Sequence, residues 1–335
     1  MRVHVPPCKI SPHRRMVPDE IMCFLKFHFQ ITCVRSAGQK VEFDGEEYVI
    51  EELTADSFRD VDIALFSAGG SISKNFAPAA VEHGTIVIDN SSAFRMDPTC
   101  PLVIPEVNGD EVKQFSIGGK AGIIANPNCS TILCLMAVTP LHRSKTVKRM
   151  VVSTYQAASG AGAAAMKELE TQTKEVLNGD EPTTTIFGRQ YAFNIFSHNS
   201  SVDLENGYNE EELKMVKETK KIWGDNDVRV TATCIRVPVM RAHAESINLQ
   251  FEEGIELQEA KDLLAGFPGV SVMDDRAGND FPTPLAASFK DDIYVGRLRH
   301  DLSQDGHKGL DMFICGDQIR KGAALNAVQI AELLV

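Results

Sequence analysis

The first candidate for chemistry is Cys129, which lies in the stretch 123–132, IIANPNCSTI. An apolar run ends there at a turn containing Pro127, and a helical pattern begins. At the start of a helix the backbone N–H groups are unpaired and the dipole is positive, which favours a thiolate over a thiol. The sulfur is therefore a candidate nucleophile. A buried structural thiol is the alternative, since free cysteine is usually a core residue.

A thiolate nucleophile needs a partner that transfers protons. His243 is the strongest candidate among the nine histidines, because it begins an alternating strand pattern between Arg241 and Glu245. We expect these two charged neighbours to orient or polarise its ring. A surface or core histidine without a catalytic role is the alternative reading.

A loop of small residues at 157–162, AASGAG, separates a predicted strand at 147–156 from a predicted helix at 163–177. Small residues allow the close backbone approach that a phosphate or a nicotinamide needs. The signal is weak by itself, since small residues also ease the packing of a helix on a strand.

Strand patterns at 62–67, 85–89 and 123–125 alternate with small-residue loops and a helical pattern at 73–83. This alternation is typical of a doubly wound α/β sheet, in which ligands bind beyond the carboxyl ends of the strands. A hairpin with an Asp-Gly turn is expected at 41–50.

The second half of the chain has a different pattern. Alternating strands are expected at 228–237, 244–252, 270–273, 293–298 and 312–315, with helices at 210–222 and 322–334. Long alternating strands predict a mainly antiparallel sheet with one face on helices. The last helix is expected to return to the first domain.

The composition limits the possible partners. The 335 residues carry a net charge of −12, and no basic tract stands out, so we expect no nucleic-acid partner. No apolar run approaches the ~20 residues of a membrane span. The eight cysteines lack the spacings of a zinc site, so we expect neither a metal nor a disulfide framework. Free thiols of this kind are typical of a reducing compartment, which we therefore expect.

Several separate segments resemble the aspartate-semialdehyde dehydrogenases. The matching segments are NPNCST at 126–131, YQAASGAG at 155–162, CIRVPV at 234–239, AHAE at 242–245 and GDQIRKGAA at 316–324. They occur in the family's order from about residue 35 to the end, and the segment 240–245 is most similar to plant-type members. The resemblance implies an α/β protein with an incomplete Rossmann-like NADP-binding domain and an α+β catalytic and dimerisation domain. The expected boundaries are 1–33 for an atypical N-terminal segment, 34–128 with 319–335 for the first domain and 129–318 for the second.

The resemblance also implies a reaction. L-aspartyl 4-phosphate is reduced by NADPH to L-aspartate 4-semialdehyde and inorganic phosphate, a step toward lysine (through diaminopimelate), threonine, methionine and isoleucine. Cys129 would carry the acyl group as a thioester, and His243 would move the proton in both directions. Gln156 would position the substrate, and backbone N–H groups at the start of the Cys129 helix would stabilise the oxyanion.

The remaining site residues follow from the same resemblance. Arg236 would hold the substrate carboxylate, and Glu218 would receive the substrate amino group. Gln156 would place the substrate beside the thiol, and Arg95 and Lys221 would bind the phosphate. The expected cofactor-binding residues are Arg35, Ser36, Ser67, Gly69, Ser159, Gly160, Gln318 and Asn326. Family members are usually homodimers built through the second domain. Plant-type members work in the plastid stroma, and otherwise the cytoplasm is expected.

The N-terminus departs from the family, which opens with a strand and a glycine-rich turn that binds the pyrophosphate. No glycine precedes Gly38, and residues 1–33 look unrelated to that unit. Either the recorded start is wrong or the chain is a real variant with damaged cofactor binding. The basic, proline-rich start is also compatible with part of a transit peptide, although serine is sparse.

Three alternative functions follow. A catalytically impaired homologue that still dimerises would fit the missing turn. An acyl-phosphate reductase for N-acetylglutamyl phosphate fits less well, because an acetylated amine needs no partner such as Glu218 beside Arg236. A thiol hydrolase would leave the phosphate and cofactor matches unexplained.

Overall fold

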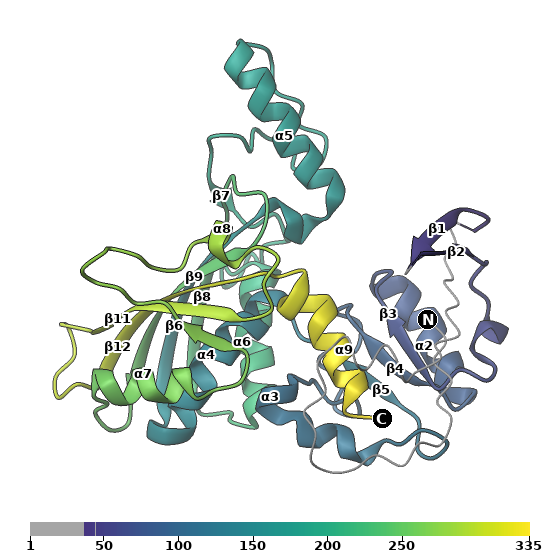
Figure 1. Cartoon of the computed structure of the whole chain (residues 1–335), viewed down its shortest axis with the longest axis horizontal. Coiled ribbons are helices and arrows are strands. Elements are labelled where there is room, and N and C mark those ends of the chain that lie inside the picture. Colours follow the sequence, from purple (N-terminus) through teal and green to yellow (C-terminus); the bar gives the residue numbers. More distant parts are fainter. Residues whose placement is uncertain (1–36, 44) are drawn as a thin grey trace. The chain divides into compact units, whose positions relative to one another are not determined.

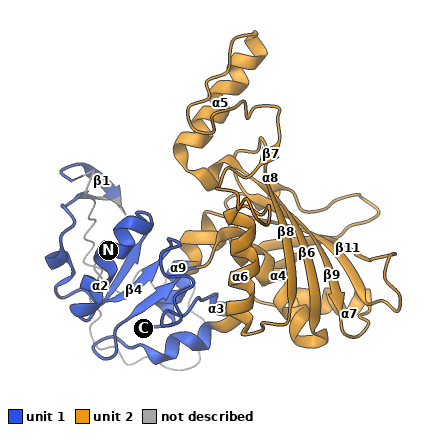
Figure 2. Ribbon diagram, turned by 180° about the vertical axis from the view of Figure 1, so that it is seen from behind, with its two compact units in different colours: residues 1–105, 109–126, 327–335 blue, residues 106–108, 127–326 orange. Residues whose placement is uncertain are grey.

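The computed structural model describes residues 37–43 and 45–335. Two compact units divide the chain (Figure 2): the first contains residues up to 105 with 109–126 and 327–335, and the second contains 106–108 and 127–326. The expected boundaries were 128/129 and 318/319. Within the described residues no helix combines the length and apolar character that a membrane crossing needs.

The first unit is built on three short parallel strands in the order β3-β4-β5 (Figure 1). Their bounds are Ile63–Phe66 for β3, Ile86–Asp89 for β4 and Ile123–Ala125 for β5. Helix α2, Gly70–Glu82, connects β3 to β4. The remaining elements are the hairpin β1 Lys40–Phe43 and β2 Glu46–Val49, η1 Ala55–Phe58 and η2 Gly109–Gln114. The short helix α3, Pro105–Asn108, precedes η2, and its residues 106–108 belong to the second unit. The hairpin and the strand-helix-strand alternation predicted for this region are confirmed.

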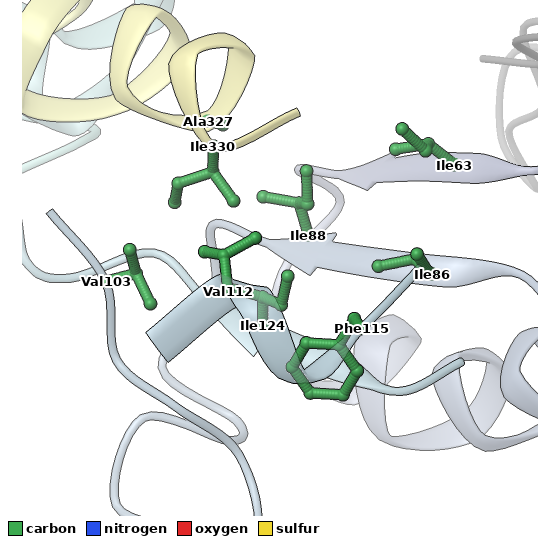
Figure 3. Packing of buried hydrophobic residues seen from close by; sticks show 9 residues of the cluster. All are labelled: Ile63, Ile86, Ile88, Val103, Val112, Phe115, Ile124, Ala327 and Ile330. Carbon is green, nitrogen blue, oxygen red and sulfur yellow. The ribbon is translucent and has the colours of Figure 1, made fainter. Parts of the chain in front are cut away.

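Both faces of this small sheet are covered, because successive side chains of each strand point to opposite sides. Ile86 and Ile88 pack with Ala327 and Ile330 of helix α9, Leu325–Glu332 (Figure 3). Val87 points the other way, into a cluster with residues of α2. The predicted return of the last helix to the first domain is therefore confirmed.

The second unit contains a seven-stranded sheet in the order β10-β11-β12-β9-β6-β8-β7. Four pairings are antiparallel, whereas β6–β8 and β10–β11 are parallel. The strands are β6 Val147–Gln156, β7 Phe196–Ser197, β8 Arg229–Arg236, β9 His243–Phe251, β10 Val270–Val272, β11 Ile293–His300 and β12 Gly309–Gly316. The predicted mainly antiparallel sheet is confirmed, with β6 and β8 parallel because a long crossover through α6 connects them.

Three helices cover one face of this sheet (Figure 2): α4 Cys129–Lys145, α6 Glu210–Trp223 and α7 Leu257–Ala265. Helix α4 lies in the middle of this layer, between α6, which packs on β8, and α7, which packs on β10 and β11, and its residues 130–141 are all buried. Helix α5, Ala163–Asn178, projects from the rest of the unit (Figure 1). The short elements are η3 Ala158–Ala161, α8 Pro284–Ala287 and the π-helix η4 Arg320–Ala324.

Candidate active site

Cys129 is the first residue of α4, as the sequence predicted, and it is half-buried. The side chain of Asn128 caps the helix, since its Oδ1 accepts the N–H groups of Ser130 at 3.0 Å and Thr131 at 3.2 Å. These two N–H groups are therefore occupied. That backbone N–H groups at this helix start stabilise an oxyanion stays a prediction, and it cannot rest on these two groups while Asn128 caps the helix.

The other cysteines near the sheet have a different environment. Cys134 and Cys234 are buried, and burial raises the pKa of both thiols above the ordinary value. Both therefore stay protonated and behave as small apolar residues. Cys129 differs from them by its partial exposure and by its place at a helix N-terminus.

Three side chains expected at the site lie in one row across the sheet. Gln156 ends β6 and Arg236 ends the parallel neighbour β8, where the two are paired in register. His243 begins β9 on the other side of β6, one position before the pair Ala244 and Tyr155. The ends of three adjacent strands thus bring together residues that are far apart in the sequence. The most distant pair, Gln156 and His243, is separated by 87 positions.

His243 is fully buried, and a backbone group orients its ring. Nδ1 accepts the N–H of Ala157 at 3.0 Å, so the neutral ring carries its proton on Nε2. Nε2 has no hydrogen-bond partner among the described residues. Burial, with a further contribution from the positive charge of Arg236, lowers the pKa of His243 to about 3. The ring is therefore neutral near pH 7.

The expectation that Arg241 and Glu245 orient this ring is wrong. Ala242 has a φ of 70°, which interrupts the strand geometry. Arg241 instead pairs through Nε with Asp317 Oδ2 at 2.6 Å. Glu245 lies two residues further along β9, and neither of its oxygens has a hydrogen-bond partner within the described part of the chain. Burial raises the pKa of Glu245 well above its ordinary value.

Arg236 is 4% exposed and is held on three sides. Its Nη1 donates to the carbonyl of Ala157 at 3.2 Å, its Nε to Asn199 Oδ1 at 3.2 Å, and its Nη2 to His198 Nε2 at 2.8 Å. A guanidinium has five N–H groups, so one remains on each terminal nitrogen. These two can still form the bidentate pair with a carboxylate that the sequence predicts.

Gln156 has its amide fixed by two acceptors. Nε2 donates to Ser130 Oγ at 2.8 Å and to Glu211 Oε1 at 3.3 Å. Sequence reasoning did not identify Glu211, or His198 beside Arg236. A glutamate in the first turn of a helix usually complements the dipole, and an isolated histidine is usually structural, so neither residue gave a distinctive signal.

The predicted substrate and phosphate ligands are placed as follows. Glu218, in α6, is 1% exposed, and its Oε2 accepts the backbone N–H of Asn128 at 2.7 Å. Lys221 lies three residues further on the same helix and is half-buried. In the first unit, Arg95 is 8% exposed and donates to the carbonyls of Asn126 and Asn90, each at 2.9 Å.

The cofactor residues predicted in the second unit mostly gather beside His243. Gln318 Oε1 accepts the N–H of Ala242 at 3.0 Å, and Gln318 Nε2 donates to Ser159 Oγ. Gly160 is exposed, yet a Cβ there would lie 3.0 Å from His243 Nε2. The bare glycine and the unpartnered Nε2 leave an approach to the ring, which fits a planar group such as a nicotinamide. Asn326 is buried at the start of α9.

The cofactor residues predicted in the first unit lie at the end of β3. Ser67 and Gly69 are exposed in the loop that leads into α2. Gly69 has a φ of 91° at the N-cap, where no side chain caps the helix. A glycine at an uncapped helix start fits a phosphate, which binds such N–H groups directly. Arg35, Ser36 and the segment 1–33 lie outside the described residues.

One surface cluster has the residue types of a metal site. Ligand atoms of Glu256, His300 and His307 lie within 4.8 Å of one another. The two imidazole rings stack at 3.9 Å with an interplanar angle of 17°, so their in-plane lone pairs do not converge on one point. His307 Nδ1 is 2.8 Å from Glu256 Oε1, so two of the three members already contact each other directly.

Comparison with known proteins follows the same division of the chain. Residues 16–115 match the family model described as semialdehyde dehydrogenase, NAD binding domain, and residues 138–321 match semialdehyde dehydrogenase, dimerisation domain. The first match begins inside the segment 1–33, although the missing glycine turn itself stays a prediction.

Individual relatives agree with the family models. The chain is 50% identical over 301 residues to the aspartate-semialdehyde dehydrogenase of Synechocystis sp., covering 90% of this chain and 87% of that protein. It is 47% identical over 329 residues to the Aquifex aeolicus enzyme, covering 98% and 93%. A crystal structure of Vibrio cholerae aspartate semialdehyde dehydrogenase II complexed with ASA superposes with a TM-score of 0.87 at 41% identity, covering 94% and 91%. The chain therefore belongs to the aspartate-semialdehyde dehydrogenase family of oxidoreductases.

Proposed function

We propose that this chain reduces L-aspartyl 4-phosphate to L-aspartate 4-semialdehyde with NADPH, and that Cys129 carries the acyl group as a thioester. The observation that supports the thioester most directly is the position of Cys129, half-buried at the first residue of α4. Its sulfur also interacts electrostatically with the guanidinium of Arg236. A helix N-terminus and a nearby cation both stabilise a thiolate.

The thiolate attacks the acyl carbon, a C–S bond forms, and the C–O bond to the phosphate breaks with its electron pair on the phosphate. The reduced nicotinamide, when bound, supplies the hydride that reaches the thioester carbon. The C–S bond then breaks and restores the thiolate. One proton is consumed overall, and it ends on the phosphate.

His243 would act as a neutral hydrogen-bond donor toward the oxygen that becomes negative. Its Nε2–H has no partner among the described residues, while the N–H groups of Ser130 and Thr131 are occupied by Asn128. Protonation of Nδ1 would break the bond from Ala157, which disfavours an imidazolium. Transfer of a proton through this ring, as the resemblance implies, would need the ring to leave Ala157.

Charge complementarity supports a substrate with a carboxylate. The two remaining N–H groups of Arg236 fit a planar anion. We propose Glu218 for the amino group, although its carboxylate already accepts the Asn128 N–H. Lys221 and Arg95 stay proposed phosphate ligands, each within its own unit.

We propose NADP as the cofactor in preference to NAD. Arg35 suits the 2′-phosphate better than a free ribose hydroxyl, which would prefer an acid. The fit of Gly69 at the start of α2 and of Gly160 beside His243 supports a dinucleotide in general. Substitution of Arg35 by serine is expected to lower kcat/KM for NADP and leave that for NAD within about twofold.

We also propose a homodimer in which the face of the seven-stranded sheet opposite α4 is covered. Alternate residues of β6 on that face, Val151, Ser153 and Tyr155, are only half-buried in one chain. The family model for residues 138–321, described as a dimerisation domain, supports this. The place in lysine, threonine, methionine and isoleucine formation follows from the proposed reaction. A plastid location rests on the plant-type resemblance alone, and the relatives compared above are bacterial.

The test is phosphate-dependent reduction of NADP with aspartate 4-semialdehyde, the reverse direction. The purified chain should turn over, and Cys129→Ser should lose at least about 10³-fold in kcat, since a hydroxyl is a much weaker nucleophile. A wild-type chain without turnover would support the catalytically impaired homologue. Turnover in Cys129→Ser close to the wild-type rate would refute the thioester.

A further inference from the structure

Glu211 is a buried carboxylate that contacts two side chains of the proposed site, Asn128 and Gln156. It is 4% exposed, in the first turn of α6. Burial by itself would raise the pKa of Glu211, but Lys214, His198 and the Asn128 hydrogen bond together lower it to about 2. Lys214 Nζ lies 3.1 Å from Oε2. Glu211 is thus ionised at any pH at which the enzyme would work, and an ionised carboxylate only accepts hydrogen bonds.

Its Oε1 accepts from two amide side chains next to the thiol. Asn128 Nδ2 donates at 2.8 Å and Gln156 Nε2 at 3.3 Å. Asn128 is also the cap of α4, so its Oδ1 must face the helix and its NH₂ must face Glu211. The two amides are therefore held in one orientation by the same oxygen.

These contacts prevent the side-chain amide of Gln156 from flipping, that is, from exchanging its oxygen and its NH₂ group. Its NH₂ already serves Ser130 Oγ and Glu211 Oε1. A flipped amide would place Gln156 Oε1 against an ionised carboxylate, which repels it and cannot donate. Oε1 accepts no hydrogen bond from the described residues, so it is the part of the amide that is available to a ligand.

We propose that Glu211 is a positioning residue, which fixes Gln156 so that its carbonyl oxygen faces the reactants as a hydrogen-bond acceptor. Gln156 then binds an N–H or O–H of the substrate or of the tetrahedral adduct, and it takes no part in stabilising an oxyanion. This inference rests on the proposed function, because it assigns a role within that reaction.

The test compares Glu211→Gln with the matched control Glu210→Gln, an exposed glutamate one residue earlier on the same helix. A glutamine at 211 keeps the shape but lets both amides adopt either orientation. We expect Glu211→Gln to lower kcat at least about tenfold, with KM for the semialdehyde within about threefold. Glu210→Gln should match the wild type in both constants.

A second measurement distinguishes an effect of Glu211 on Gln156 from an effect on Asn128 and the Cys129 thiol. The rate of Cys129 alkylation by iodoacetamide should stay within about twofold of wild type in Glu211→Gln. In a Gln156→Ala background, the substitution at 211 should cost less than about twofold in kcat, because the group it positions is gone. Glu211→Asp replaces Glu211→Gln if the latter does not fold, which its thermal unfolding curve shows.

Two results would overturn the inference. One is a kcat of Glu211→Gln within about threefold of wild type. The other is an equal loss in turnover and in alkylation, which would place the effect on the thiol. An inactive wild type would instead contradict the proposed function, so the two failures are distinguishable.

Discussion

Gly160 offers a sharp test of how rigid the site is. An alanine Cβ at this position would lie 2.9 Å from His243 Cε1, 3.0 Å from His243 Nε2 and 3.2 Å from Arg236 Nη1. Carbon contacts are normally about 3.5–4.0 Å, so one side must move by roughly 0.5–1 Å. Gly160 does not have a positive φ, so the backbone itself tolerates alanine.

Neither neighbour can move at low cost. His243 is held at Nδ1 by the Ala157 N–H, and Arg236 is held by three hydrogen bonds. Overpacking of this kind costs about 1–3 kcal/mol. If that cost falls on the reactive geometry, Gly160→Ala should lower kcat/KM by about 5- to 150-fold.

The assay is NADPH formation from aspartate 4-semialdehyde and phosphate, with thermal unfolding measured in parallel. The matched control is Ala164→Ser, a similar small increase at an exposed position of α5. We expect the control to equal the wild type, and the Tm of Gly160→Ala to fall by no more than about 4 °C per kcal/mol. A Gly160→Ala enzyme with kcat/KM within twofold of wild type would refute the view that His243 and Arg236 are fixed.

Four further predictions concern other buried groups. Burial lowers the pKa of His243 to about 3 and that of His198 to about 4, so both rings take up a proton when the protein unfolds below about pH 6.5. Stability should therefore fall as the pH drops from about 6.5 toward 4, which a series of Tm measurements against pH would show. The acid limb of kcat should likewise lie well below pH 6.5, and a limb at 6.5 that disappears in His243→Asn would contradict a neutral ring. Burial raises the pKa of Glu245 well above its ordinary value, so the wild type loses stability as the pH rises above about 4.5. Glu245→Gln should therefore be more stable than wild type at pH 8 and should lose that advantage at pH 4.5. An alanine Cβ at Gly322 would lie 3.1 Å from Cys129 Cβ. Gly322→Ala should therefore slow alkylation of Cys129 and lower kcat about fivefold. An unchanged alkylation rate would argue against this contact.

Apolar periodicity was enough to predict the elements that place the nucleophile. The buried run 123–125 and the helical pattern after Pro127 put Cys129 at a helix start, where the structure has it. Such signals are local, because a strand buried on both faces and a helix N-terminus each leave a pattern in consecutive residues. The return of the last helix was predictable for a related reason, since its apolar stripe at Ala327 and Ile330 needs a partner.

Long-range pairing decided what the sequence could not show. The parallel pairing of β6 and β8 puts Arg236 beside Gln156, and α6 then brings Glu211 under both. Sequence neighbours were a poor guide to the orientation of His243, because the ring bonds to the backbone of Ala157 on the adjacent strand. Charges such as Glu211 look like solvated helix residues until their burial is known.

The central claim is that Cys129 carries the acyl group. The most direct measurement is mass spectrometry of the enzyme incubated with aspartate 4-semialdehyde and NADP in the absence of phosphate, followed by acid quench and proteolysis. Without phosphate to accept it, the aspartyl group should accumulate on the peptide that contains Cys129, and added phosphate should remove it. An aspartyl adduct on another residue, or phosphate-dependent turnover in the absence of any adduct on Cys129, would contradict the account.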